Sequence, residues 1–130
     1  MSNKPILIVC GEPNSIFSEI LVKSFNHYKS HKPIILLGSY DLLSNQLNKL
    51  QIRFDFNLSY TKNKKIYNVK KYKINIINID YKFKSPFENI SSNSNDYISK
   101  CFKKAFQLIK YNNISGLING PISKKNFLKD

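Results

Sequence analysis

PILIVC at residues 5–10, followed at once by GEPN at residues 11–14, decides the fold class of this chain. The first six residues form a continuous apolar run of strand length, which is typical of a central strand buried on both faces. The next four form a turn, with Asn14 or Ser15 placed to cap a helix. The apolar stripe of that helix is Ile16, Phe17, Ile20, Leu21, Phe25 and Tyr28. A strand that turns directly into a helix predicts an α/β fold.

A second unit repeats this order. Residues 33–38 are again apolar, and Ser39 is placed to cap the helix that follows. The apolar stripe of that helix is Leu42, Leu43, Leu47 and Leu50. An order of strand, helix, strand, helix predicts a parallel sheet with right-handed crossovers.

The middle of the chain alternates apolar and polar residues. Residues 52–58 alternate as a strand with one wet face should, residues 61–65 form a turn, and residues 71–80 alternate before becoming apolar. We interpret the two alternating segments as a peripheral antiparallel pair or as an edge extension of the sheet.

The last third contains the clearest amphipathic helix. It covers residues 97–111, with Ser94 or Asn95 as its cap, and Asn112-Asn113 ends it. A short strand at residues 115–118 and a loop follow, and Ser123 is placed to cap a last helix. We expect residues 1–130 to form a single incomplete α/β domain, the N-terminal portion of a larger enzyme.

The net charge of +13 suggests a polyanion partner, but the residue choice argues against one. Arg53 is the only arginine among 21 basic residues, and arginine is the side chain that clamps phosphate with two parallel bonds. We therefore attribute most of the charge to compositional drift on a solvated surface. Residues 62–73 mix lysines with Tyr67 and Tyr72, which could hold a single strand. The favoured interpretation is a hairpin with its apolar residues turned inward and its lysines turned outward.

The remaining bulk features point to a cytoplasmic protein. No apolar run approaches the roughly 20 residues of a membrane span, and the run before Cys10 is too short for a signal peptide. We expect no membrane partner. Cys10 and Cys101 are predicted to be buried, reduced thiols, and we do not expect His27 and His31 to form a metal site.

Two loops that follow predicted strands are the candidates for chemistry, because ligands bind at the carboxyl ends of strands in open α/β sheets. The first holds Gly11, Glu12 and Pro13. It lacks the glycines of a dinucleotide fingerprint and the Gly-Lys-Ser/Thr of a Walker loop. A ligand loop and a plain tight turn remain open, and Glu12 is either a substrate-facing carboxylate or a charge favoured by the helix dipole.

The second loop offers amide, hydroxyl and ammonium groups within one turn, which suits a phosphorylated or carboxylated small molecule. A Gly-Pro turn with a serine cap and a surface lysine is the equally open alternative. Its candidate residues are Asn119, Gly120, Pro121, Ser123 and Lys124.

Together the two ends of the chain resemble 4-hydroxythreonine-4-phosphate dehydrogenases. Residues 4–20, with Gly11-Glu12-Pro13 and Glu19-Ile20, look like the opening of that family, whose first strand is followed by Gly-Asp/Glu-Pro-Ala-Gly-Ile-Gly-Pro-Glu. Residues 33–43 are similar to its second strand and Asp-Leu-Leu helix. Residues 116–124, GLINGPISK, look like its Ala-Leu-Val-Thr-Gly-Pro-Ile-Asn-Lys segment. The motifs occur in the family's order.

The resemblance implies an N-terminal part of an isocitrate/isopropylmalate dehydrogenase-like α/β/α sandwich. It also implies NAD- and divalent-metal-dependent oxidation of 4-phosphohydroxy-L-threonine in pyridoxal phosphate (vitamin B6) biosynthesis, with zinc, magnesium or cobalt as the metal. The partners would be this phosphorylated amino acid and, at full length, a second copy in a homodimer. The implied cleft wall contains Gly11, Glu12, Pro13, Asn119, Gly120, Pro121, Ser123 and Lys124, with Lys124 the best single candidate for touching substrate.

The chain also departs from the family pattern. Ser15, Phe17 and Ser18 stand where the family has Gly, Gly and Pro, and Ser123 stands where Asn or His is usual. The family's metal-binding histidines have no counterpart here, since neither His27 nor His31 matches one. We therefore expect no complete catalytic set, no metal ligands and no activity of this chain alone. A small lysine-rich nucleic-acid-binding module and an inactive, truncated relative are the alternatives.

Overall fold

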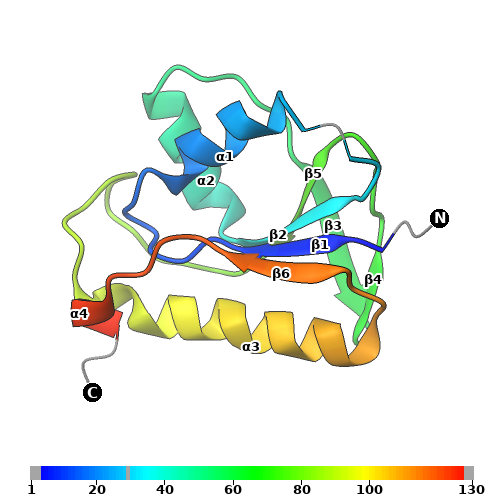
Figure 1. The fold of residues 1–130 in the computed structure, drawn as a ribbon. Helices are drawn as coiled ribbons and strands as arrows, with labels where there is room; N and C mark the ends of the chain where they lie inside the picture. Colours follow the sequence, from blue (N-terminus) through cyan, green and yellow to red (C-terminus); the bar gives the residue numbers. More distant parts are fainter. Residues whose placement is uncertain (1–3, 29, 128–130) are drawn as a thin grey trace.

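A computed structural model describes residues 4–28 and 30–127 of the chain. Its centre is a six-stranded sheet in the order β4-β3-β5-β2-β1-β6 (Figure 1). All neighbouring strands are parallel except β3 and β4, which are antiparallel. The strands are β1 (Ile6–Val9), β2 (Ile34–Gly38), β3 (Asn57–Lys62), β4 (Lys65–Tyr67), β5 (Ile74–Asn78) and β6 (Gly116–Asn119).

Helices cover both faces of this sheet. The helix α1 (Phe17–Phe25) and the helix α2 (Tyr40–Lys49) lie on one face, and the long helix α3 (Asn95–Tyr111) lies on the other (Figure 1). A 3-10 turn, η1 (Ser92–Ser94), precedes α3, and a short helix, α4 (Lys124–Phe127), follows β6. The three layers confirm the predicted α/β/α arrangement. Among the described residues, no helix is both long enough and apolar enough to span a bilayer.

Strand β1 explains why the opening run is apolar throughout. Leu7 and Val9 pack into the core beneath α3, whereas Ile8 and Cys10 pack into the core beneath α1 and α2. Both faces are thus buried, as in parallel sheets generally. Cys10 and Cys101 are buried free thiols, as predicted.

The predicted antiparallel pair in the middle of the chain is wrong. Strand β5 lies inside the sheet and is parallel to both β2 and β3. The reason is burial: residues 74–77 are buried without a break, which requires cover on both faces. The alternative, an edge extension, also fails for residues 71–80, since the edge of the sheet is formed by β3 and β4.

The inward face predicted for residues 52–58 is confirmed at Phe54 and Phe56, which pack against the core, but it is wrong at Leu58. The strand begins only at Asn57, Leu58 is 51% exposed, and Asn57 and Ser59 are buried instead. Hydrogen bonds cause the inversion. Asn57 Nδ2 donates to Asn75 Oδ1 at 2.7 Å, and Ser59 Oγ donates to the Asn68 carbonyl at 2.8 Å. Buried amides with partners are tolerated where unpaired ones are not.

The turn predicted at residues 61–65 is a tight hairpin between β3 and β4. Asn63 and Lys64 both have positive φ, at 50° and 66°, as the two central residues of a type I′ turn require. Lys62, Lys64 and Lys65 are exposed, as the hairpin interpretation predicted. Its inward apolar face is wrong, because Tyr67 and Tyr72 are 43% and 74% exposed.

Two helix starts differ from the sequence prediction. Helix α1 begins at Phe17 with Ile16 as its N-cap residue, so neither Asn14 nor Ser15 is the cap. Ile16 and Ile20 are 63% and 49% exposed, because α1 buries the side that carries Leu21 and Val22. Helix α3 has Ser94 at its N-cap position, but the Ser94 hydroxyl does not cap the helix. That hydroxyl contacts the candidate site instead.

Candidate functional site

The two candidate loops leave the sheet side by side. Strands β1 and β6 are parallel neighbours, with Val9 opposite Asn119, so the loop after each strand starts at the same sheet edge. The Gly120 amide donates to the Val9 carbonyl at 2.7 Å, and the Glu12 amide donates to the Pro121 carbonyl at 2.7 Å. The structure therefore brings together two motifs that are more than 100 residues apart in the sequence.

Two glycines make this close approach possible. A Cβ atom on Gly120 would lie 2.2 Å from the Cys10 carbonyl oxygen. A Cβ atom on Gly11 would lie 2.5 Å from the Pro121 carbonyl oxygen, and Gly11 has a φ of +75° that other residues rarely adopt. Both distances are far inside normal contact, so each loop needs a residue without a side chain where it meets the other.

Glu12 is buried, with 4% of its surface exposed, and its carboxylate is used within the protein. Oε2 accepts a hydrogen bond from the Asn14 amide at 2.9 Å, and Oε1 accepts one from the Ser94 hydroxyl at 3.1 Å. The carboxylate thus ties the loop after β1 to the start of α3. A direct contact between Glu12 and a substrate stays a prediction.

Pro13 is held from the other side by a residue that sequence analysis missed. Gln46 is 1% exposed, and its Nε2 donates to the Pro13 carbonyl at 2.6 Å and to the Pro86 carbonyl at 2.8 Å. The sequence held one signal for Gln46: it is a polar residue on the apolar stripe of α2, one position before Leu47. Ser94 gave no comparable signal, because a serine before a helix is ordinarily a cap.

The remaining candidates lie on the outer side of the second loop. Asn119 and Lys124 are exposed and Ser123 is half-buried. Lys124 opens α4 three residues after Pro121, a stretch of chain that spans at most about 11 Å. Because Pro121 is bonded to Glu12, Lys124 and Glu12 belong to the same end of the sheet.

The space behind the first loop is closed. The cavity bounded there by Glu12, Pro13, Ser18 and Gln46 has a volume of about 10 Å³, which is at the lower limit for one water molecule. Phe17, which replaces a family glycine, contributes to this filling: its Cδ1 lies 3.2 Å from where a Cβ on Gly120 would be. Any metabolite at this site must therefore lie on the outer, exposed side of the loops.

The described residues do not offer a metal centre. Within residues 4–28 and 30–127, no three or more His, Cys, Asp or Glu side chains are grouped to hold an ion. The loop glycines face protein backbone and leave no open cradle for a dinucleotide phosphate. Burial raises the pKa of Cys10 and of Tyr97 and raises the pKa of Cys101 to about 12, so these three groups are neutral at pH 7. These residues alone do not form a binding site for NAD or for a metal ion.

A comparison with protein families gives a match over residues 29–130, to the family described as "Pyridoxal phosphate biosynthetic protein PdxA". The chain belongs to the PdxA family. This membership confirms the resemblance noted from the two loop motifs. A search among curated proteins finds no match to the chain.

Solved structures support the same fold for this PdxA-family chain. Proteins named as 4-hydroxythreonine-4-phosphate dehydrogenase match from Salmonella typhimurium (TM-score 0.67, 19% identity), Burkholderia phymatum (0.70, 16%) and Klebsiella pneumoniae (0.69, 20%). These alignments cover 93–94% of this chain but 38% of each solved chain. The chain thus spans less than two-fifths of the length of these relatives.

Proposed function

We propose that this chain supplies one wall of the substrate cleft of a dehydrogenase that oxidises 4-phosphohydroxy-L-threonine in pyridoxal phosphate biosynthesis. NAD as hydride acceptor and a divalent metal ion belong to the same proposal. The described residues provide no ligand set for either, so the proposal assigns both to polypeptide outside this chain. On its own, the chain should not turn over the substrate.

The observation that carries the proposal is the hydrogen-bonded contact between the two loops at the carboxyl ends of β1 and β6. Substrates of open α/β enzymes bind at that edge of the sheet. The second loop presents an exposed amide at Asn119 and an exposed ammonium at Lys124, groups that suit a phosphate or carboxylate. In this arrangement, Lys124 contacts the substrate, and Glu12 holds the loop in place.

The surface beside the loops supports a cleft shared with further polypeptide. Within the part of the chain that the structure describes, β6 is the last strand on its side of the sheet. Ile118 is 53% exposed, and it lies opposite Ile8 in the sheet, on the face that α1 covers. The start of α1 carries two further exposed apolar residues, Ile16 and Ile20. A free strand edge with apolar residues beside it is a surface that other polypeptide readily covers. The proposal also includes a homodimer for the complete enzyme and a cytoplasmic location.

The experiment joins this chain with the part of a relative that it does not span. The 130-residue chain is incubated with 4-phosphohydroxy-L-threonine, NAD and Mg²⁺, Zn²⁺ or Co²⁺, alone and together with a polypeptide that holds the remaining part of the Klebsiella pneumoniae relative. NADH absorbance should stay at baseline for the chain alone and rise for the mixture. Turnover by the chain alone would contradict the expected need for further polypeptide.

Lys124 provides the test of the site itself. In the reconstituted mixture, Lys124→Ala should raise KM by about tenfold, since a hydrogen bond to a charged group is worth roughly 1.5–3 kcal/mol. The matched control is Lys125→Ala, which removes the next exposed lysine of the same short helix. Equal effects of the two substitutions would reject Lys124 as a substrate contact.

A further inference from the structure

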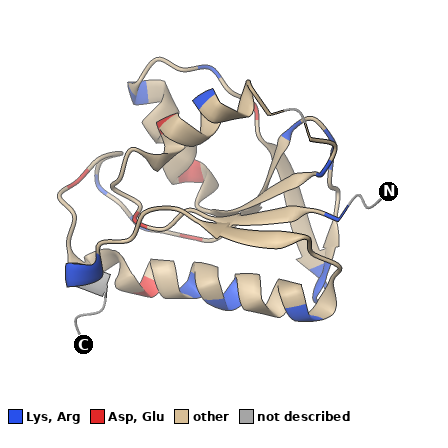
Figure 2. Cartoon of the chain, in the orientation of Figure 1, with Lys and Arg blue, Asp and Glu red and all other residues tan. Residues whose placement is uncertain are grey.

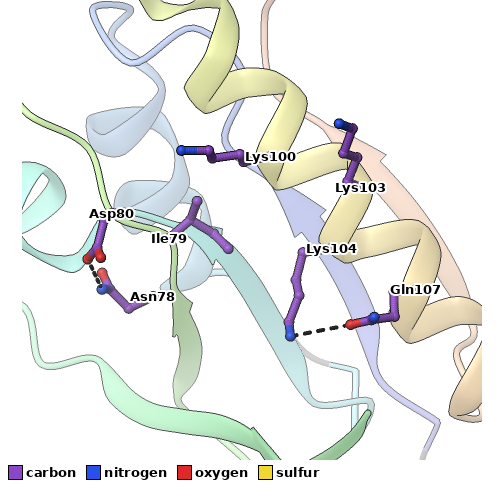
Figure 3. A pocket seen from close by; sticks show the side chains of 7 residues that line it. All are labelled: Asn78, Ile79, Asp80, Lys100, Lys103, Lys104 and Gln107. Atoms are coloured by element: carbon purple, nitrogen blue, oxygen red, sulfur yellow. Dashed lines mark hydrogen bonds between the residues drawn. The ribbon is translucent and has the colours of Figure 1, made fainter.

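A separate hollow lies on the α3 side of the sheet, where β5 ends (Figure 3). It has a volume of about 450 Å³ and is open to solvent. Its polar lining consists of Asn78 and Asp80 at the end of β5 and of Lys100, Lys103, Lys104 and Gln107 on α3. None of these residues belongs to the two loops described above, so the hollow is a different site from the proposed substrate cleft.

The three lysines occupy one side of α3, because positions 100, 103 and 104 are spaced three and four residues apart. Figure 2 shows basic residues in blue on this helix. In Figure 3, the Lys100 and Lys104 side chains extend from α3 in different directions, and the Lys103 side chain is turned away from Asp80. Like charges at this spacing repel and destabilise a helix slightly. A bound anion would remove that repulsion.

Lys104 carries the strongest argument, because it is half-buried and its partners are neutral. Its Nζ donates to Thr61 Oγ1 at 2.9 Å and to Gln107 Oε1 at 3.4 Å. These bonds orient the ammonium group without cancelling its charge. Among the described residues, no carboxylate forms an ion pair with Lys103 or Lys104.

The other charges leave the hollow positive. Lys100 pairs with Asp96 at 3.0 Å, but both side chains are largely exposed, so this pair is weak. Asp80 is the one carboxylate in the lining, and its Oδ1 already accepts a hydrogen bond from Asn78 Nδ2 at 2.9 Å. The lining thus contains three ammonium groups and one carboxylate.

We propose that this hollow binds a small, multiply charged anion of the phosphate class, with pyrophosphate as the probe. Lysine ammonium groups bind phosphate as point charges, and the Gln107 and Asn78 amides can add hydrogen bonds. Ile79 is the only apolar residue of the lining, and the lining includes no aromatic ring on which a base could stack. The lining therefore favours the phosphate group itself over a nucleobase.

The test is a calorimetric titration of the 130-residue chain with pyrophosphate at fixed ionic strength. The variant is Lys100→Gln/Lys103→Gln/Lys104→Gln. The matched control is Lys49→Gln/Lys71→Gln/Lys82→Gln, which removes the same charge at exposed positions outside the hollow. Circular dichroism verifies that both variants are folded. We expect saturable 1:1 binding that the hollow variant weakens about tenfold or more and the control less than about twofold.

A single substitution guards against misfolding of the triple variant. Lys103→Gln alters an exposed side chain and should weaken binding by about threefold. Equal weakening by the control would mean that only the overall charge attracts the anion, and would overturn the proposal. So would the lack of saturable binding, or lysine-dependent binding of single-stranded DNA without binding of pyrophosphate.

Discussion

A methyl group at position 120 should push the two loops of the candidate site apart. In Gly120→Ala, the new Cβ would lie 2.2 Å from the Cys10 carbonyl oxygen and 2.9 Å from the Cys10 carbonyl carbon. Ordinary contact begins at 3.4 Å, so one backbone segment must move by about 1 Å. Both clashing atoms are backbone atoms at the end of a buried central strand, so no flexible side chain can turn aside to relieve the clash.

The cost follows from two contributions. Overpacking of a filled region costs typically about 1–3 kcal/mol. The displacement should also break the hydrogen bonds from Gly120 to Val9 and from Glu12 to Pro121, each of which contributes about 1 kcal/mol. We expect Gly120→Ala to lower the free energy of unfolding by about 3–5 kcal/mol, a large part of the roughly 5–15 kcal/mol of a typical domain.

Urea unfolding followed by far-UV circular dichroism measures this loss, and amide hydrogen exchange at Glu12 and Gly120 reports whether the loops separate. The control is Gly116→Ala in the same strand, where a Cβ would meet no atom within 4 Å. That substitution should be neutral or stabilise by up to about 1 kcal/mol, because glycine weakens a strand. A Gly120→Ala protein within about 0.5 kcal/mol of wild type would refute the proposed contact of the loops.

Three further predictions concern buried polar groups. Glu12→Ala should cost about 2–4 kcal/mol in urea unfolding, since it leaves the Asn14 amide and the Ser94 hydroxyl without their acceptor; Glu12→Gln, which keeps one acceptor oxygen, should cost about half as much. Asn75→Ala should cost about 3 kcal/mol or more by the same measurement, because it removes bonds to β2, β3 and the loop before β5; a loss below about 1 kcal/mol would contradict this. Burial raises the pKa of the Cys101 thiol to about 12, so this thiol loses its proton at a lower pH in the unfolded chain than in the folded one, and the free energy of unfolding should fall between about pH 9 and 12. Cys101→Ala should make this fall shallower, and an unchanged pH slope would contradict the prediction.

The sequence predicted best where burial alone determines structure. The apolar runs of β1 and β2 and the stripe of α3 identified these elements, because an unbroken run requires cover on both faces and a stripe requires cover on one. The Ser39 cap is also confirmed: its side chain accepts a hydrogen bond from the backbone amide of Leu42, within one turn of helix. These features depend on residues close together in the chain.

Prediction failed where a distant partner changes which residues can be buried. Asn57 is buried and Leu58 is exposed because the side chain of Asn75, 18 residues later, accepts a hydrogen bond from the side-chain amide of Asn57. Ser94 was a plain cap by sequence, yet its hydroxyl bonds to Glu12, 82 residues earlier. The periodicity of apolar residues within a short segment does not indicate such distant partners.

By itself, the sequence determined the α/β class, the two loop motifs and the family they resemble, since each depends on burial patterns and residue types within short stretches. Only the tertiary structure decided that β5 lies inside the sheet, that Glu12 is enclosed by protein, and that Gly11 and Gly120 meet backbone to backbone. The physical reason is that strand order, burial of a charge and contact between two glycines all depend on packing between segments far apart in the chain.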